Sequence, residues 1–241
     1  MIIYLASPTT QLQAEMMAGC DVLESFAIAA TNRWAVRYRP TWRRVMLDSG
    51  AFSEMTTGKP VDFGTYLDFA QEHASGYDEI VNLDVISGEV SARVDAGKRN
   101  LQAMRDAGLD PLPVFHQGEP WSVLEELASC GKVGLGFQRP IACADEFLSG
   151  CFSRIPSSCR VHGFAMANAR YTGRYPFASV DAATWWHEVN AILSVRGQAS
   201  DALEYLTVGE ILRDIVIRKY ERLPRATAWA GTRQMGLFTE E

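Results

Sequence analysis

Short apolar runs rich in β-forming residues alternate with longer amphipathic stretches along the 241-residue chain. The short runs predict seven strands, at Met1–Leu5, Arg44–Asp48, Glu79–Asp84, Leu112–His116, Lys132–Phe137, Arg160–Met166 and Phe177–Asp181. The longer stretches predict helices at Thr10–Ala29, Asp62–His73, Ser91–Ala107, Trp121–Ser129, Asp145–Phe152, Thr184–Leu193 and Val208–Arg222. Elements that alternate in this order form a parallel sheet joined by crossover helices.

This rhythm favours an α/β fold of the (β/α)8 TIM-barrel type, in a single domain over residues 1–241 with a C-terminal helical tail from about residue 205. Seven strands are apparent, and the eighth could form near Arg225–Ala230 or elsewhere. A doubly wound sheet is the alternative, because its strands are also buried on both faces and give near-continuous apolar runs. No repeat, low-complexity tract or linker divides the chain.

Composition narrows the class of protein further. Hydrophobic residues make up 47% of the chain and charged residues 22%, which is typical of a globular protein and excludes disorder as its main state. No apolar run is long enough to span a bilayer and no basic leader precedes the first run, so we expect a cytoplasmic protein. The five cysteines are scattered without a C-x-x-C pair, which argues against a disulfide framework and a zinc ribbon.

Polar residues mark the ends of several predicted strands. Asp48, Asp84 and Asp181 each end a strand, and His116 with Gln117 ends another. A single Asp in this position is commonly a helix N-cap. Three aspartates and a glutamine at four strand ends instead predict one convergent site, because barrel enzymes carry their chemistry at the C-terminal ends of their strands.

Four short motifs surround these residues. The sharpest is DSGAFS at residues 48–53, where Gly50 would let the backbone approach a flat ligand closely. The others are HQGE at 116–119, GLGF at 134–137 and SVD at 179–181. Glycine weakens a strand interior, so Gly134 and Gly136 predict a place where a ligand lies against the sheet.

DSGAFS resembles the DSGGFQ-type motif of the tRNA-guanine transglycosylases, the queuine tRNA-ribosyltransferase family. The later motifs follow in the same order as in that family: Asp84, Gln117-Gly118, the glycine-rich strand, His162-Gly163 and Asp181. The resemblance covers roughly residues 44–181, and DSGAFS is its one fairly specific motif.

The resemblance implies a role for each matching residue. Asp181 would be the nucleophile that attacks C1′ of the sugar, and Asp48 would be the general acid/base for the departing and incoming bases. Asp84 and Gln117 would hydrogen-bond the edge of the base. Two carboxylates with different environments suit such a double displacement. The expected substrate-site residues are Ser49, Gly50, Phe52, Asp84, His116, Gln117, Gly134, Gly136 and His162, the last either in contact with substrate or packed beneath it.

The departures from the family bear on the substrate. Its tRNA-acting members carry a C-x-C-x-x-C zinc site after the nucleophile, whereas this chain has no cysteine after Cys159, so no metal is expected. The chain is also shorter and resembles small members from phages and mobile elements, which exchange guanine in DNA for a 7-deazaguanine such as preQ0. DNA is therefore the expected substrate, with tRNA as the alternative, and the absence of a G-x-G-x-x-G or Walker A pattern predicts no nucleotide cofactor.

One segment is a candidate for binding nucleic acid. Residues 33–44 read RWAVRYRPTWRR, in which arginines suited to phosphate alternate with aromatic residues suited to stacking on bases. The expected phosphate contacts are Arg33, Arg37, Arg39 and Arg43; the alternative is a solvated connector. The net charge of −6 gives no support to nucleic-acid binding by the chain as a whole.

Two other functions fit the same residues. In a barrel glycosidase or nucleosidase, Asp181 and Asp48 would hydrolyse a small glycoside with water in place of the incoming base. The non-enzymatic alternative is a nucleic-acid-binding accessory protein that keeps the barrel but has lost catalysis; the three strand-end carboxylates argue against it, because they would repel phosphate.

Overall fold

In the computed structural model, which describes residues 1–51, 58, 60–136, 144–187, 214, 217–229 and 231, eight parallel strands form one sheet in the order β4-β3-β2-β1-β8-β7-β6-β5. The strands are β1 (Ile2–Ala6), β2 (Asp21–Ser25), β3 (Arg44–Asp48), β4 (Glu79–Ile80), β5 (Val114–His116), β6 (Lys132–Gly136), β7 (Arg160–Gly163) and β8 (Ser179–Ala182). The two outer strands meet at a parallel bridge between Val81 and Leu112. There Leu112 N–H donates to Ile80 O at 2.7 Å and Asn82 N–H donates to Leu112 O at 2.9 Å. The strands thus go round a barrel in sequence order, which confirms the predicted TIM-barrel-like fold.

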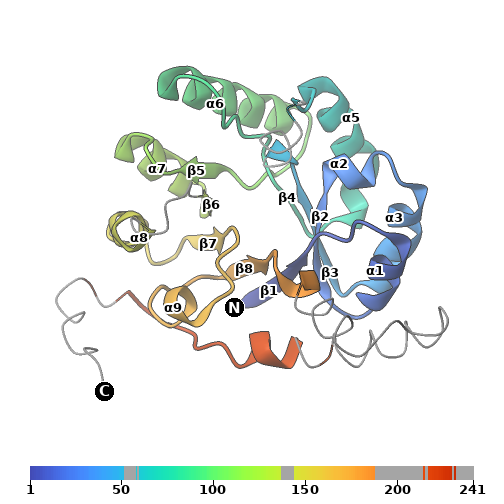
Figure 1. The fold of residues 1–241 in the computed structure, drawn as a ribbon. Helices are drawn as coiled ribbons and strands as arrows, with labels where there is room; N and C mark the ends of the chain where they lie inside the picture. The colour runs from blue at the N-terminus through green and yellow to red at the C-terminus, as the bar shows by residue number, and fades with distance from the viewer. Residues whose placement is uncertain are drawn as a thin grey trace.

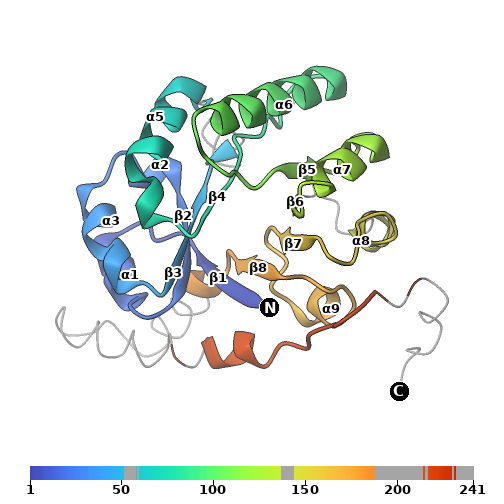
Figure 2. The same ribbon diagram turned by 180° about the vertical axis from the view of Figure 1, so that it is seen from behind.

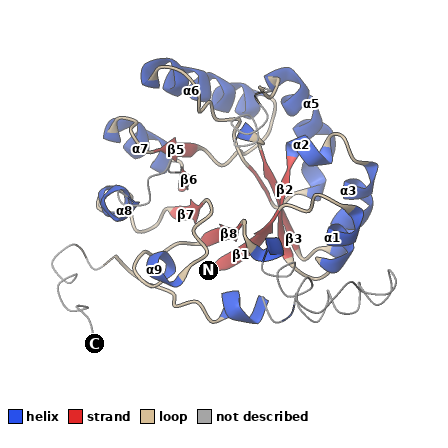
Figure 3. Ribbon diagram, viewed as in Figure 1, coloured by secondary structure: helices blue, strands red, loops and turns tan. Residues whose placement is uncertain are grey.

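The helices lie outside the strands, as Figures 1 and 3 show. They are α1 (Gln11–Met16), α2 (Phe26–Ala29), α3 (Arg33–Tyr38), α5 (Phe63–His73), α6 (Val90–Asp106), α7 (Trp121–Ala128), α8 (Ala144–Phe152) and α9 (Ala169–Thr172), with 3-10 turns at Arg39–Thr41 and Ala74–Gly76. The view from behind in Figure 2 shows the same ring of helices around the strands. None of the helices in the described part of the chain has the length and apolar character that a bilayer crossing requires.

The barrel is filled with side chains. One buried cluster joins strands on opposite sides of the ring and consists of Tyr4, Leu23, Met46, Val81, Leu112 and Val114. Three further clusters pack the strands against the surrounding helices. Burying one apolar side chain of this size contributes about 1.5–3 kcal/mol to the stability of the fold. The cluster inside the barrel and the clusters between strands and helices together hold the strands, and so their ends, in place.

The predicted helix over Thr10–Ala29 is wrong, because β2 occupies Asp21–Ser25 within it. Helix α1 ends at Met16, and Gly19 follows with φ +75, a backbone conformation that glycine adopts without strain. The eighth strand is therefore β2, and residues 225–229 form no strand.

The other predicted elements are found with shifted ends. Strand β3 matches its prediction, whereas β4 and β7 stop earlier and β8 begins two residues later. Helix α5 begins after Asp62, whose side chain accepts the Thr65 N–H at 2.9 Å as an N-cap. Most of the predicted Thr184–Leu193 and Val208–Arg222 helices and of the C-terminal tail lies outside the described residues.

Candidate active site

The turn that follows β3 presents Asp48 at the mouth of the barrel. Asp48 Oδ2 accepts the Gly50 N–H at 3.1 Å, and Ser49 Oγ accepts the Ala51 N–H at 3.3 Å. Gly50 has φ +81 and lies against Ala27, so a side chain there would be strained. The DSGA part of the motif is therefore a tight turn that aims its first two side chains, while Phe52 lies outside the described residues.

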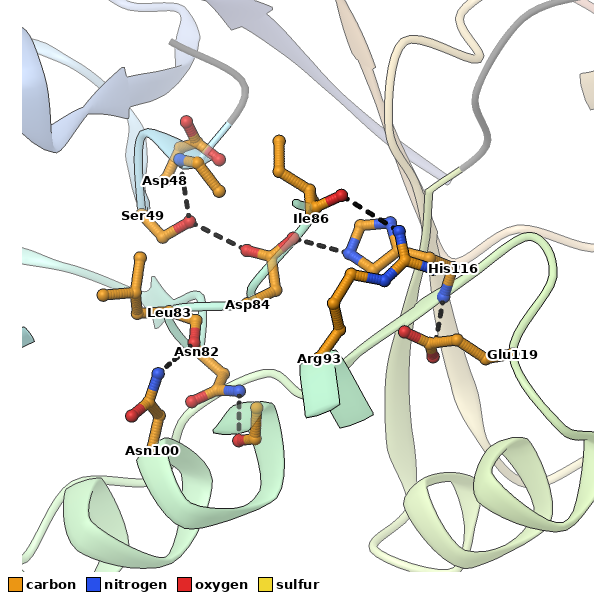
Figure 4. A network of polar contacts seen from close by, with 12 residues as sticks. Asp48, Ser49, Asn82, Leu83, Asp84, Ile86, Arg93, Asn100, His116 and Glu119 are labelled. Atoms are coloured by element: carbon orange, nitrogen blue, oxygen red, sulfur yellow. Dashed lines mark hydrogen bonds and ion pairs between the residues drawn. The ribbon is translucent and has the colours of Figure 1, made fainter. Parts of the chain in front are cut away.

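Asp84 joins this turn to β5 (Figure 4). Its Oδ1 accepts a hydrogen bond from Ser49 Oγ at 3.0 Å, and its Oδ2 lies 2.6 Å from His116 Nε2. Burial lowers the pKa of His116, but the hydrogen bond with Asp84 and the charge of that carboxylate outweigh it, so the pKa lies above its ordinary value. Both Asp84 oxygens are thus engaged by protein groups, whereas the family resemblance assigns this residue to the edge of the base.

The HQGE motif is a turn that fixes His116. Glu119 N–H donates to His116 O at 3.2 Å, and Gly118 has the positive φ of +92 that this turn requires. Glu119 Oε2 accepts the His116 N–H at 3.1 Å, so the side chain of this motif supports the backbone of the histidine. Gln117 is partly buried, and its side chain makes no hydrogen bond to the described residues.

The two glycines of β6 make room for neighbouring side chains. A Cβ on Gly136 would lie 2.8 Å from His116 Nδ1, and one on Gly134 would lie 2.6 Å from Phe164 Cε2. The expectation that these glycines mark a surface for a ligand is therefore corrected: the space beside them is filled by His116 and Phe164.

Replacing Gly136 with alanine is expected to push the His116 ring away from Asp84. A contact of 2.8 Å to the ring is too short for a Cβ, and overpacking of this kind costs about 1–3 kcal/mol. The measurement is urea unfolding together with the imidazole NMR signals of His116. Gly97→Ala is the matched control, because a Cβ on Gly97 meets nothing within 4 Å; equal effects of the two substitutions would contradict the role of Gly136.

Asp181 lies at the end of β8, next to β1, and is 4% exposed. Its Oδ1 accepts the Ala165 N–H at 2.7 Å. Ala165 has φ +56, and no other non-glycine residue in the described part of the chain has a positive φ. A strained residue of this kind costs about 1–3 kcal/mol and is commonly found at functional sites, so the loop after β7 holds Asp181 at an energetic cost.

The electrostatics of the mouth separate Asp48 from the other carboxylates. The pKa of Asp48 is raised to about 7, chiefly by desolvation and further by the negative charges of Asp84 and Asp181, while the Gly50 hydrogen bond opposes the rise. Asp84 and Asp181 therefore each lie within electrostatic reach of Asp48. At neutral pH Asp48 can both donate and accept a proton. The described residues contain no cluster of three or more His, Cys, Asp or Glu side chains placed to hold a metal ion.

Several residues of the site escape a sequence-based analysis. Arg93 on α6 donates to Ile86 O at 2.9 Å and lies near His116 and Glu119 (Figure 4). Ala165 carries no chemical signal, since only its backbone acts. Glu119 was detectable, because HQGE spaces a carboxylate three residues from the histidine that it supports.

The candidate phosphate-binding segment is largely structural. Arg39 is 7% exposed, donates from Nε to Glu24 Oε2 at 3.1 Å and lies 4.3 Å from the ring centre of Tyr77, so its assignment to phosphate is wrong. Arg43 donates from Nε to Asp21 Oδ1 at 2.8 Å. Arg43 directly precedes β3, whereas Asp48 ends that strand, so the two residues lie at opposite ends of the barrel. Arg33 and Arg37 on α3 are exposed and remain candidates.

Replacing Arg39 with alanine is expected to destabilise the protein by about 3–5 kcal/mol, because it leaves the 1% exposed Glu24 carboxylate without its cation. Urea unfolding measures this loss. The matched substitutions Arg33→Ala and Arg37→Ala should each change stability by less than about 0.5 kcal/mol. A loss at Arg39 no larger than at these exposed sites would contradict the structural role.

Comparison with known proteins finds similar folds among solved structures. No protein-family profile and no curated protein sequence matches the chain. Among solved structures, it is similar to the YdjI aldolase from Escherichia coli K12, with a TM-score of 0.61 and 9% identity over 92% of this chain and 90% of that chain. It is also similar to a chain of the tryptophan synthase complex from Pyrococcus furiosus, with a TM-score of 0.53 and 13% identity over 89% of this chain and 95% of that chain. Identities this low show a shared barrel fold, so function has to be argued from the site.

Proposed function

We propose that the protein is an enzyme, a base-exchanging transglycosylase that replaces guanine in DNA with a 7-deazaguanine such as preQ0. The observation that carries this proposal is that the carboxylates at the barrel mouth have different surroundings. Asp48 has a pKa of about 7, whereas Asp181 has one oxygen held by a backbone N–H. Glycosyl transfer with a covalent intermediate uses two carboxylates in different environments, one as acid/base and one as nucleophile, and this pair supports that assignment.

The reaction is a double displacement. An Asp181 oxygen attacks C1′ while the bond from C1′ to guanine N9 breaks, and Asp48 gives its proton to the departing base. The product of this half is an ester between Asp181 and the sugar. The incoming base then loses its N9 proton to Asp48 and attacks C1′, which breaks the ester and returns both aspartates to their starting forms.

The other residues prepare this chemistry. Burial, and after it the charge of Asp84 held between Ser49 and His116, raise the pKa of Asp48 and so keep its proton in place near neutral pH. DNA is proposed over tRNA because the chain lacks the cysteines of the zinc site of the tRNA-acting enzymes. Arg33 and Arg37 are the proposed phosphate contacts.

The test is transfer of radiolabelled guanine. The protein is incubated with labelled base and with duplex DNA, single-stranded DNA or tRNA, and label in the polymer is counted. Incorporation into DNA supports the proposal, and incorporation into tRNA alone supports the alternative substrate. Release of free base with abasic sites identifies a hydrolase, while binding without exchange or release excludes catalysis on these polymers.

A further inference from the structure

The buried histidine of β7 has one ring nitrogen without a partner. His162 is 2% exposed, and its Nδ1 lies 2.9 Å from Ser179 Oγ. Its Nε2 is completely buried and has no hydrogen-bond partner in the described part of the chain. A buried polar atom without a partner costs about 1–3 kcal/mol, so its retention requires an explanation.

The unpartnered nitrogen faces the candidate nucleophile. His162 Nε2 lies 3.6 Å from Asp181 Oδ1, slightly beyond hydrogen-bond distance. The same oxygen accepts the Ala165 N–H at 2.7 Å, whereas Oδ2 accepts no hydrogen bond from the described residues. The two oxygens of Asp181 therefore have different surroundings.

The ring of His162 is fixed in place. Tyr4 and Phe164 pack edge to face against it, with ring centres 6.1 Å and 4.5 Å away. Phe164 occupies the space that Gly134 leaves open. When Ser179 Oγ–H donates to Nδ1, the proton of a neutral ring is on Nε2, which then points at the carboxylate.

We propose that His162 is a positioning residue for Asp181, whose Nε2–H stabilises Oδ1 and so leaves Oδ2 as the atom that bonds to C1′. This inference rests on the proposed function. In the ester, Oδ1 is a carbonyl oxygen with little charge, and the full carboxylate charge returns when the incoming base breaks the C1′–Oδ2 bond. A donor to Oδ1 therefore favours the carboxylate as a leaving group and acts mainly in the second half of the reaction.

The experiment measures the two halves separately. Protein and DNA are first mixed without acceptor base, and the denaturation-resistant adduct is followed over time; preQ0 is then added and the loss of adduct is timed. His162→Phe is expected to slow release of the adduct about 10–100-fold. It should not slow formation of the adduct, because the donor stabilises the free carboxylate before attack more than it stabilises the transition state. His162→Gln, whose amide can donate from a similar position, should restore much of the release rate.

Two controls keep the test decisive. Ser179→Ala should also slow release of the adduct, by a smaller factor than His162→Phe. It takes the place of His162→Phe if circular dichroism shows that His162→Phe does not fold. His73→Gln, on helix α5, is the matched histidine substitution outside the site. Release at the wild-type rate in folded His162→Phe, or equal slowing of both halves, overturns the inference and leaves the proposed function standing. A wild type that forms no adduct and exchanges no base overturns both.

Discussion

Replacing Asp181 with asparagine is expected to abolish both base exchange and the covalent adduct with DNA. An amide is a poor nucleophile and its ester-like product is a worse leaving group, so exchange should fall by about 10³-fold or more. The fold should persist, because the asparagine carbonyl can still accept the Ala165 N–H. The measurements are labelled-guanine incorporation and adduct detection by denaturing electrophoresis, with thermal unfolding to check the fold.

Asp145→Asn is the matched control for this substitution. Asp145 lies on α8 and pairs with Arg170 and Arg174, so this substitution removes the charge from two partly exposed ion pairs and alters no group of the barrel mouth. It should change stability by about 1 kcal/mol or less and leave exchange unchanged. Exchange at the wild-type rate by Asp181→Asn would end the proposed assignment, and Asp84 would become the next candidate nucleophile.

The rhythm of strands and helices was readable because barrel strands are buried on both faces. Runs such as Val45–Leu47 and Val133–Leu135 are apolar on both faces, so each strand stands out from the amphipathic helices around it. The strand-end aspartates were readable for the same reason, since a carboxylate that ends a buried run requires an explanation. These two signals are local in sequence and together specify the barrel and its mouth.

Strand β2 was hidden because its acidic residues find partners far away in the chain. In the sequence pattern, the acidic residues Asp21 and Glu24 indicate the polar face of a helix. In the structure they are buried, with exposed fractions of 3% and 1%. Their burial is possible because Arg43 pairs with Asp21 and Arg39 pairs with Glu24. Tertiary ion pairs thus override local preference, and the buried pair with Glu24 occupies Arg39, which is 7% exposed.

The glycines of β6 show a second limit of sequence-based prediction. A glycine in a strand indicates a close approach, but the sequence does not say what approaches. In the structure the neighbours are the side chains of His116, from β5, and Phe164, from the loop after β7. The two glycines therefore shape the site through the residues that they admit, which is visible only once the strands are placed side by side.

Replacing Asp48 with asparagine is expected to impair catalysis and, at neutral and alkaline pH, to make the fold more stable than that of the wild type. Without a proton donor for the departing base, adduct formation should fall by about 10²–10⁴-fold. The folded-state pKa of about 7 lies above the ordinary value of 3.8, so the ionised form of Asp48 opposes folding. The contribution of protonated Asp48 to the free energy of unfolding is therefore fully present below about pH 4 and is lost progressively as the pH rises through 7. Asparagine should raise the free energy of unfolding by up to about 4 kcal/mol at pH 9 and change it little at pH 4.

The pH dependence of the wild type follows from the same group. Formation of the adduct requires protonated Asp48, so its rate should fall about tenfold for each pH unit above 7. Removing the neighbouring charge by Asp84→Asn should move this limb to lower pH, because that charge helps to raise the pKa of Asp48. Rates of adduct formation between pH 5 and 9 measure the first effect, and urea unfolding of the wild type and of Asp48→Asn between pH 4 and 9 measures the second. A flat rate profile would contradict titration of the proton donor near pH 7, and an Asp48→Asn protein no more stable than the wild type at pH 9 would contradict the raised pKa of Asp48.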